Sequence, residues 1–224
     1  MKRIIIKTKD GSSSIYLPDL DEYYHSKHGA INEAYHVFIK NGLDLFDKGS
    51  NIDIMEIGFG TGLNCFITFL ESQKRKLQIN YNGIDAFPLK AEEISQLNYV
   101  EELKAVDHKN IFNKIHQTDW NEQIKINSNF VLKKRKQFFK EINDKNQFDL
   151  IYFDAFGARV QPELWTEEIF NRMYIALKNN GILVTYSAKG SVRRAMQSVG
   201  FVVERLPGPP GKREMLRGKK IIVI

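Results

Sequence analysis

The chain is poor in cysteine: Cys65 is the only one among 224 residues, so an internal disulfide is excluded. This indicates a reducing, cytoplasmic setting. Long apolar runs are also missing. The N-terminal segment holds only three consecutive apolar residues, Ile4–Ile6, and no other stretch is long enough to cross a bilayer. We therefore expect neither a signal peptide nor contact with a membrane.

Metal-ligand spacing is absent as well, since the five histidines and Cys65 form none of the closely spaced sets that bind metals. We expect no metal site. Cys65 should serve packing only, because buried cysteine is common and no histidine lies near it in the sequence. His25 and His28 are candidates for substrate contact, but we expect both at the surface.

The charge is biased toward basic residues, with 33 Lys and Arg against 27 Asp and Glu, a net charge of +6. This balance fits a nucleic-acid partner without proving one. Each basic cluster, taken singly, suits a solvated surface; together they make a polyanionic partner a serious hypothesis. The clusters are 74–76, 133–136, Arg193-Arg194 and the stretch from Lys212 to Lys220.

The N-terminal 50 residues predict an extension to the main fold. Ile4–Ile6 and Ser14–Leu17 flank Asp10-Gly11, a pattern typical of a small hairpin. Apolar residues at helical spacing predict a helix over 29–42.

Strand and helix patterns alternate over residues 51–224, which indicates a mostly parallel sheet with sites at the carboxyl ends of its strands. Length and the absence of linkers or repeats favour one domain, 1–224. The predicted strands are 52–57, 79–84, 130–132, 148–153 and 181–186, and the predicted helices are 63–73, 88–106, 137–143, 166–179 and 191–199.

Two further strands, 201–205 and 220–224, end the chain. The loop 206–218 between them is too short for a crossover helix, so they should pair antiparallel. An antiparallel hairpin at the end of such a sheet is typical of S-adenosylmethionine-dependent methyltransferases and not of dinucleotide dehydrogenases.

Glycines recur at 58, 60 and 62, between a predicted strand and a predicted helix. Gly58 and Gly60 permit a tight turn and close backbone approach to a ligand, and Gly62 lets the helix pack near the strand. The N–H groups of the helix then point at the ligand. This pattern predicts a nucleotide-cofactor loop.

Two acids near this loop select the cofactor. Asp85, 23 residues after Gly62, ends the next strand, where a carboxylate accepts ribose hydroxyls. Glu56 precedes the loop and would attract a cationic sulfonium or ammonium while repelling a pyrophosphate. This favours S-adenosylmethionine over NAD. The alternative for Asp85 is a place in a surface turn. The alternative for Glu56 is that backbone N–H groups of the loop hold its carboxylate.

Asp154 follows the apolar strand 148–153, where a carboxylate is costly unless it faces a cleft. This position faces the reactive end of a cofactor bound at the glycine loop. An amine acceptor must lose a proton before it can attack a methyl group, and a nearby carboxylate can take it. Asp154 is therefore the predicted catalytic residue, the alternative being a cap for the next turn.

Several segments together resemble the methyltransferase domain of the bifunctional tRNA 5-methylaminomethyl-2-thiouridine biosynthesis protein and its stand-alone relatives. The resemblance covers nearly the whole chain. It implies a Rossmann-like methyltransferase fold in which a C-terminal antiparallel hairpin and a small N-terminal hairpin and helix are added to the sheet. The matching segments are 10–12, 22–26, 28–30, 37–38, 56–64, 153–156, 161–166, 192–194 and 211–215.

The resemblance implies methyl transfer from S-adenosylmethionine to the amine of 5-aminomethyl-2-thiouridine at the tRNA wobble position. We expect a monomer without the flavin oxidoreductase domain, so another enzyme would supply the amine. Cofactor contacts are assigned to Tyr24, Glu56, Gly58, Phe59, Gly60, Thr61, Gly62, Asn64, Asp85 and Asp154. Substrate contacts are assigned to Phe156, Arg193, Arg194, Lys212, Arg213 and Met215.

One departure concerns the adenine. Many methyltransferases carry an acid after the third strand, but the stretch 131–138 has none. Gln137 or backbone groups would replace it.

Three functions remain open: a tRNA amine methyltransferase, a methyltransferase for a small amine such as a polyamine, and a non-catalytic nucleotide-binding module. Arg193-Arg194 and Lys212-Arg213 are expected to hold the tRNA. The alternative for Lys212-Arg213 is that they tie the 206–218 loop to the sheet.

Overall fold

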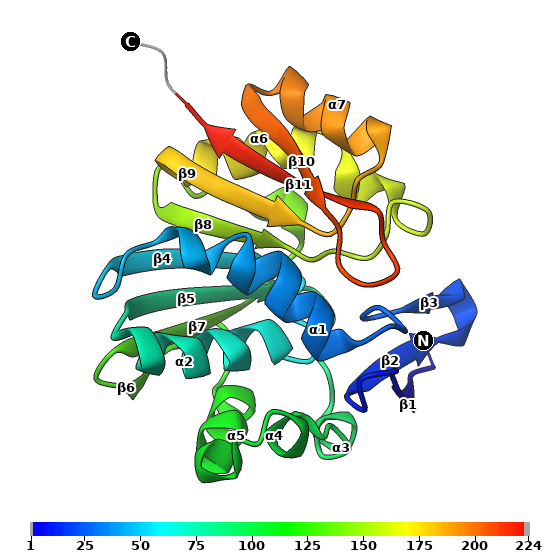
Figure 1. Ribbon diagram of the computed structural model, residues 1–224, viewed down its shortest axis with the longest axis vertical. Helices are drawn as coiled ribbons and strands as arrows, with labels where there is room; N and C mark the ends of the chain where they lie inside the picture. Colours follow the sequence, from blue (N-terminus) through cyan, green and yellow to red (C-terminus); the bar gives the residue numbers. More distant parts are fainter. Residues whose placement is uncertain (1, 222–224) are drawn as a thin grey trace.

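The alternating pattern after residue 51 forms an eight-stranded sheet in the computed structural model, which describes residues 2–221 (Figure 1). Its strands are β4 (Asn51–Ile57), β5 (Gln78–Asp85), β6 (Gln123–Asn127), β7 (Phe130–Lys136), β8 (Phe148–Phe153), β9 (Leu177–Thr185), β10 (Phe201–Pro207) and β11 (Glu214–Lys220). They lie in the order β10-β11-β9-β8-β4-β5-β7-β6. The five strands from β9 to β7 in this order are parallel. At one edge β6 pairs antiparallel with β7, and at the other edge β11 pairs antiparallel with both β9 and the outermost strand β10.

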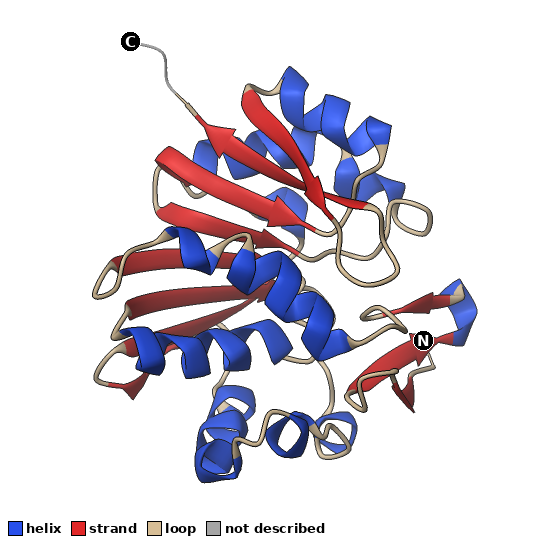
Figure 2. Ribbon diagram, viewed as in Figure 1, coloured by secondary structure: helices blue, strands red, loops and turns tan. Residues whose placement is uncertain are grey.

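Helices cover both faces of this sheet because its central strands are apolar on both sides. Figure 2 shows α1 and α2 in front of the strands and α6 behind them. Each face has its own apolar cluster, one around Phe38 and Phe66 and one around Phe153 and Phe170. The helices are α1 (Ala30–Ala34), which continues as a π-helical stretch (Tyr35–Lys40), α2 (Leu63–Arg75), α3 (Ala91–Ile94), α4 (Tyr99–Glu102), α5 (Lys109–Gln117), α6 (Glu167–Ala176) and α7 (Gly190–Ser198).

The order of the strands reverses at β4, which pairs in parallel with β5 on one side and β8 on the other. Loops that leave the carboxyl ends of β4 and β8 therefore diverge to opposite faces of the sheet. Such a divergence opens a crevice, and ligands of open α/β sheets bind in it. The glycine loop follows β4 and Asp154 follows β8, so this topology brings them together.

The predicted N-terminal hairpin is confirmed as part of a second, three-stranded antiparallel sheet, β1 (Ile4–Lys7), β2 (Ser13–Leu17) and β3 (Glu22–Tyr23). Figure 1 shows it beside the start of α1, on the side of the molecule toward which the parallel strands point. Buried hydrogen bonds fasten it to α4: the Tyr99 hydroxyl donates to the Ser13 carbonyl at 2.9 Å, and the Ser13 N–H donates to Asn98 Oδ1 at 2.7 Å.

The helix predicted over 88–106 is wrong, because only α3 and α4 form there. The segment breaks at Asn98, whose side chain bonds the backbone of the N-terminal sheet instead of continuing a helix. The helix predicted over 137–143 is a single 3₁₀ turn, Phe139–Glu141. The sequence pattern predicted neither α5 nor β6. The predicted strand 130–132 is four residues shorter than β7, because the basic run 133–136 lacks the apolar residues of a typical strand.

The predicted antiparallel C-terminal hairpin is confirmed, but its second strand was misplaced. β11 occupies Glu214–Lys220, and residues 222–224 of the predicted strand lie outside the described residues. α6 also ends earlier than predicted, at Ala176, and β9 starts directly after it. In residues 2–221 no helix is both long and apolar enough to cross a bilayer.

Candidate active site

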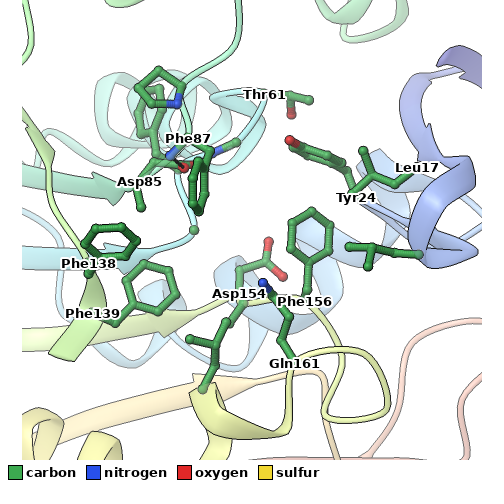
Figure 3. A pocket seen from close by; sticks show the side chains of 18 of the residues that line it. Leu17, Tyr24, Thr61, Asp85, Phe87, Phe138, Phe139, Asp154, Phe156 and Gln161 are labelled. Atoms are coloured by element: carbon green, nitrogen blue, oxygen red, sulfur yellow. Dashed lines mark hydrogen bonds between the residues drawn. The ribbon is translucent and has the colours of Figure 1, made fainter. Parts of the chain in front are cut away.

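A cavity of about 1060 Å³ opens at the carboxyl edge of the large sheet (Figure 3). Its walls come from the glycine loop, the loops after β5 and β8, the end of β7 and the N-terminal sheet. Of the predicted site residues, nine line it: Tyr24, Gly58, Phe59, Gly60, Thr61, Asn64, Asp85, Asp154 and Phe156.

The glycine loop is held close to the ends of two neighbouring strands. The N–H groups of Gly58 and Phe59 both donate to the Ile84 carbonyl at 3.0 Å. Gly58 has φ +88°, and a Cβ there would lie 2.4 Å from the Asp154 carbonyl oxygen. Only glycine tolerates both the backbone angle and this approach. The tight turn thus leads directly into α2, whose first N–H groups face the crevice.

Asp85 anchors the other side of this loop. Its Oδ2 accepts the Gly60 N–H at 2.9 Å and its Oδ1 accepts the Phe87 N–H at 2.8 Å. Burial raises the pKa of this carboxyl. It lies in the cavity wall and is not an exposed turn residue. Each of its oxygens keeps a free lone pair, which suits a pair of vicinal hydroxyls.

Glu56 is fully buried beneath the loop and does not line the cavity. Its partners are side chains: Asn64 Nδ2 donates to Oε1 and the Tyr81 hydroxyl donates to Oε2, both at 2.9 Å. Burial raises its pKa well above the usual value. The structure thus shows neither of the arrangements weighed for Glu56, a cofactor contact or bonds from loop N–H groups.

Asp154 lies at the floor of the cavity, and its carboxyl group points inward in Figure 3. Its backbone N–H donates to the Ile57 carbonyl at 2.9 Å, and its Oδ2 accepts from Asn64 Nδ2 at 2.9 Å. Asn64 therefore bridges Asp154 and Glu56. Burial, with the negative charge of Glu33, raises the pKa of Asp154 to about 7. A carboxyl group with this pKa exchanges protons readily near neutral pH.

Aromatic side chains form two walls on either side of Asp154 (Figure 3). Tyr24 and Phe156 pack edge to face at 4.9 Å between ring centroids, and the Tyr24 ring also covers Gly60. On the Asp85 side, the rings of Phe87 and Phe138 also pack edge to face, with 5.8 Å between centroids, and these side chains are 64% and 49% exposed. These walls suit two flat ligands that meet above Asp154.

The contacts proposed for the adenine need correction. Gln137 does not line the cavity, and its Oε1 accepts from Arg135 Nε at 3.2 Å. Phe87, Phe138 and Phe139 line the wall beside Asp85 instead. A signal was present in the sequence, since Phe87 lies two residues after the acid Asp85 and Phe138 lies two residues after the end of β7.

His25 does not lie at the surface as expected but in the cavity wall. Its Nδ1 lies 3.2 Å from Ser14 Oγ and its Nε2 lies 3.4 Å from Thr61 Oγ1. Burial lowers its pKa to about 4, so the ring is neutral at pH 7. Cys65 is buried in the core, as expected for a packing residue.

The five substrate residues predicted on α7 and the C-terminal hairpin do not line the cavity. Met215 is fully buried in the core. The Lys212 ammonium pairs with Glu33 Oε1 at 2.6 Å and lies 3.7 Å from the Tyr186 ring centroid. This contact ties the hairpin loop to α1. Arg194 and Arg213 are exposed, and Arg193 is half-buried.

The cavity can hold a nucleoside cofactor by the criteria of shape and chemistry. It offers a glycine cradle, a carboxylate with free lone pairs at Asp85 and an aromatic wall beside it. No set of three or more His, Cys, Asp or Glu side chains within residues 2–221 could hold a metal ion.

Known proteins resemble this chain in sequence and in fold. A family model described as S-adenosyl-L-methionine-dependent methyltransferase matches residues 95–221. The tRNA 5-methylaminomethyl-2-thiouridine biosynthesis bifunctional proteins MnmC of Leptospira interrogans and Actinobacillus pleuropneumoniae are 32% and 29% identical. The alignments cover 88% and 89% of this chain and 32% of each relative, so the chain spans about a third of their length.

Two solved structures extend this similarity. MNMC2 from Aquifex aeolicus is 25% identical with a TM-score of 0.74, over 99% of this chain and 72% of that one. Spermidine synthase from Thermotoga maritima shares the fold, with a TM-score of 0.55 at 14% identity over 99% of this chain and 73% of that one. The resemblance stated from the sequence is thus confirmed, and the chain belongs to the S-adenosyl-L-methionine-dependent methyltransferase family.

Proposed function

We propose that this protein transfers a methyl group from S-adenosylmethionine to the amine of 5-aminomethyl-2-thiouridine at the wobble position of tRNA. The observation that carries the proposal is the place of Asp154. It lies between the glycine loop and the Tyr24–Phe156 wall, at the floor of a cavity large enough for two ligands. The names of the MnmC relatives supply the class of substrate.

Cofactor binding is assigned to the side of the cavity around the glycine loop. Asp85 would accept ribose hydroxyls, and Phe87 with Phe138 would contact the adenine. The amide N–H groups at the start of α2 and the polar groups of Thr61 and Asn64 would face the methionyl end. Bound there, S-adenosylmethionine supplies a methyl group on a cationic sulfur. Glu56 acts indirectly, by holding Asn64.

Asp154 is proposed to orient the acceptor amine and remove its proton. An ammonium has no lone pair, so the nitrogen must lose a proton before it attacks the methyl carbon. The carbon–sulfur bond then breaks and sulfur keeps the electron pair, while Asp154 receives the proton released from nitrogen. Asn64, which donates to Asp154 Oδ2, holds the carboxyl group in this orientation.

Transfer of radiolabelled methyl groups to bulk tRNA that lacks this modification tests the substrate. Tritium should appear in the methylaminomethyl nucleoside after digestion, and free polyamines should remain unlabelled. Labelling of polyamines but not of tRNA would favour the small-amine alternative and overturn the proposal.

Replacement of Asp154 tests the mechanism. Asp154→Ala should lower kcat on tRNA by about 10²–10⁴, the usual range for a proton-transfer group. Binding of S-adenosylhomocysteine, measured by calorimetry, should change far less, because Asp85 and the glycine loop remain. Near-normal turnover of the variant would contradict this role.

A further inference from the structure

Three exposed lysines at the mouth of the cavity have no acidic partner in the described residues. Lys90 precedes α3, Lys136 ends β7 and Lys140 lies in the following 3₁₀ turn; all three line the cavity. Two nearby acids pair with arginines instead. Glu93 pairs with Arg3 and Asp144 with Arg135, at 3.1 and 2.8 Å.

Two acidic side chains line the cavity where α6 begins. Glu163 and Glu168, from the turn before α6 and from its first turn, are exposed and line the cavity there. Arg172 neutralises Glu168 only partly, through a solvent-exposed contact at 3.0 Å. The mouth therefore carries both cationic and anionic groups. A polyanion that reaches Asp154 lowers its electrostatic energy by approaching the three unpaired lysines and not the two acids.

The cofactor does not account for these lysines. S-adenosylmethionine carries no phosphate, and its one carboxylate belongs to the methionyl end, which is assigned to the start of α2. Its sulfonium is a cation that nearby ammonium groups would repel. In the run 133–136, two of the cationic side chains have partners inside the protein, and the one at the cavity mouth has none in the described part of the chain. Lys134 is 1% exposed and donates to the His116 carbonyl at 2.8 Å, and Arg135 is paired, whereas Lys136 reaches the mouth unpaired.

We propose that Lys90, Lys136 and Lys140, the lysine rim, bind backbone phosphates of the single-stranded RNA beside the nucleoside that enters the cavity. The inference rests on the proposed function and assigns the tRNA contact to the cavity mouth instead of Arg193, Arg194 and Arg213, which do not line the cavity. Phe138 lies between Lys136 and Lys140 in sequence, and its half-exposed ring lies 5.8 Å from the Lys140 ammonium. Lysines interleaved with an exposed ring are typical of single-stranded nucleic-acid surfaces.

Salt-dependent tRNA binding tests the lysine rim. Each lysine that no longer binds a phosphate should reduce the log–log slope of affinity against salt by about 0.7–0.9. Lys136→Ala/Lys140→Ala should therefore flatten the slope by about 1.4–1.8 and raise the KM for tRNA. Lys90→Ala should give about half that change in slope. Melting temperature and S-adenosylhomocysteine binding should stay as in the unmodified protein.

Lys48→Ala/Lys145→Ala is the matched control. These two exposed lysines precede β4 and β8, at the opposite edge of the sheet. Removing them changes the net charge equally and should leave the slope unchanged. The lysine rim is overturned if its variant matches this control, or if Arg193→Ala/Arg194→Ala alone flattens the slope.

The test separates this inference from the proposed function. An unmodified protein that methylates tRNA, with a rim variant of unchanged slope and KM, would remove only the lysine rim. An unmodified protein that neither binds nor methylates tRNA would overturn both.

Discussion

Asp154 has opposing requirements, since burial favours its neutral form and proton removal needs its charged form. Its pKa is raised to about 7, above that of an unfolded Asp, so its effect on stability has a definite sign. The favourable contribution is complete below about pH 4 and is lost as the pH rises through about 7. Activity runs the other way: kcat should rise with pH as Asp154 and the acceptor amine lose their protons.

A cationic sulfonium bound near Asp154 should favour the carboxylate and release its proton. At pH 7, where a group of pKa about 7 is half protonated, binding of S-adenosylmethionine should release up to about half a proton. Calorimetry in buffers of different ionisation enthalpy measures this. S-adenosylhomocysteine has a neutral sulfur and should release much less, and Asp154→Asn should abolish the difference. Equal proton release for both ligands would contradict close contact between the sulfonium and Asp154.

At the scale of elements, the junction between β4 and β8 depends on Gly58 more than on Gly60. A methyl at Gly58 meets the Asp154 carbonyl at 2.4 Å with φ at +88°, whereas one at Gly60 meets only the Tyr24 ring at 3.2 Å with φ at +47°. A side chain yields more readily than backbone. Gly58→Ala should lower the free energy of unfolding by about 2–5 kcal/mol and Gly60→Ala by about 1–2 kcal/mol.

Urea denaturation of the two alanine variants compares their free energies of unfolding, and calorimetry measures cofactor binding at the glycine loop. Gly60→Val should remain folded and lose cofactor binding, since its side chain would occupy the approach to the loop. A Gly60→Ala variant less stable than Gly58→Ala would show that the contact with Asp154 does not set the geometry of the junction.

At the scale of the whole molecule, Lys212 joins the C-terminal hairpin to the N-terminal helix. Its partner Glu33 is buried, with 9% of its side chain exposed against 32% for Lys212, and also accepts the Ser26 N–H at 2.8 Å. Lys212→Ala would leave Glu33 short of a counter-ion. Because Lys212 is partly exposed, the cost should be about 1–2 kcal/mol, below that of breaking a fully buried pair.

Arg213→Ala is the matched control for Lys212→Ala, because Arg213 is the adjacent cation and is exposed. Thermal melts should show a lower Tm for Lys212→Ala and no such decrease for Arg213→Ala. Glu33→Gln in the Lys212→Ala background should recover part of the stability, since the unpaired charge is then gone. Removal of Lys212 should also move the rise of kcat with pH to higher pH, because the positive charge of Lys212 lowers the pKa of Asp154. Equal melting temperatures for all variants would exclude a structural role for the pair.

The parts of this protein that depend on local pattern could be predicted from the amino-acid sequence. Strand, glycine turn and helix at 52–73, with acids at Asp85 and Asp154, specify where a crevice opens, because parallel strands end at one edge of a sheet. Composition and spacing along the chain suffice for this, since each of these patterns occupies a short continuous stretch of the sequence.

Which residues of a given type reach the cavity depends on packing between distant segments. His25 enters the cavity wall because the N-terminal sheet is hydrogen-bonded to Asn98 and Tyr99, and the helical pattern of 88–106 breaks because Asn98 makes those bonds. In the run 133–136, a hydrogen bond to the His116 carbonyl and contact with the Trp120 ring hold Lys134 in the interior, and the Lys136 side chain stays unpaired within residues 2–221. Burial and pairing of a charge depend on groups distant in sequence, and no local pattern encodes them.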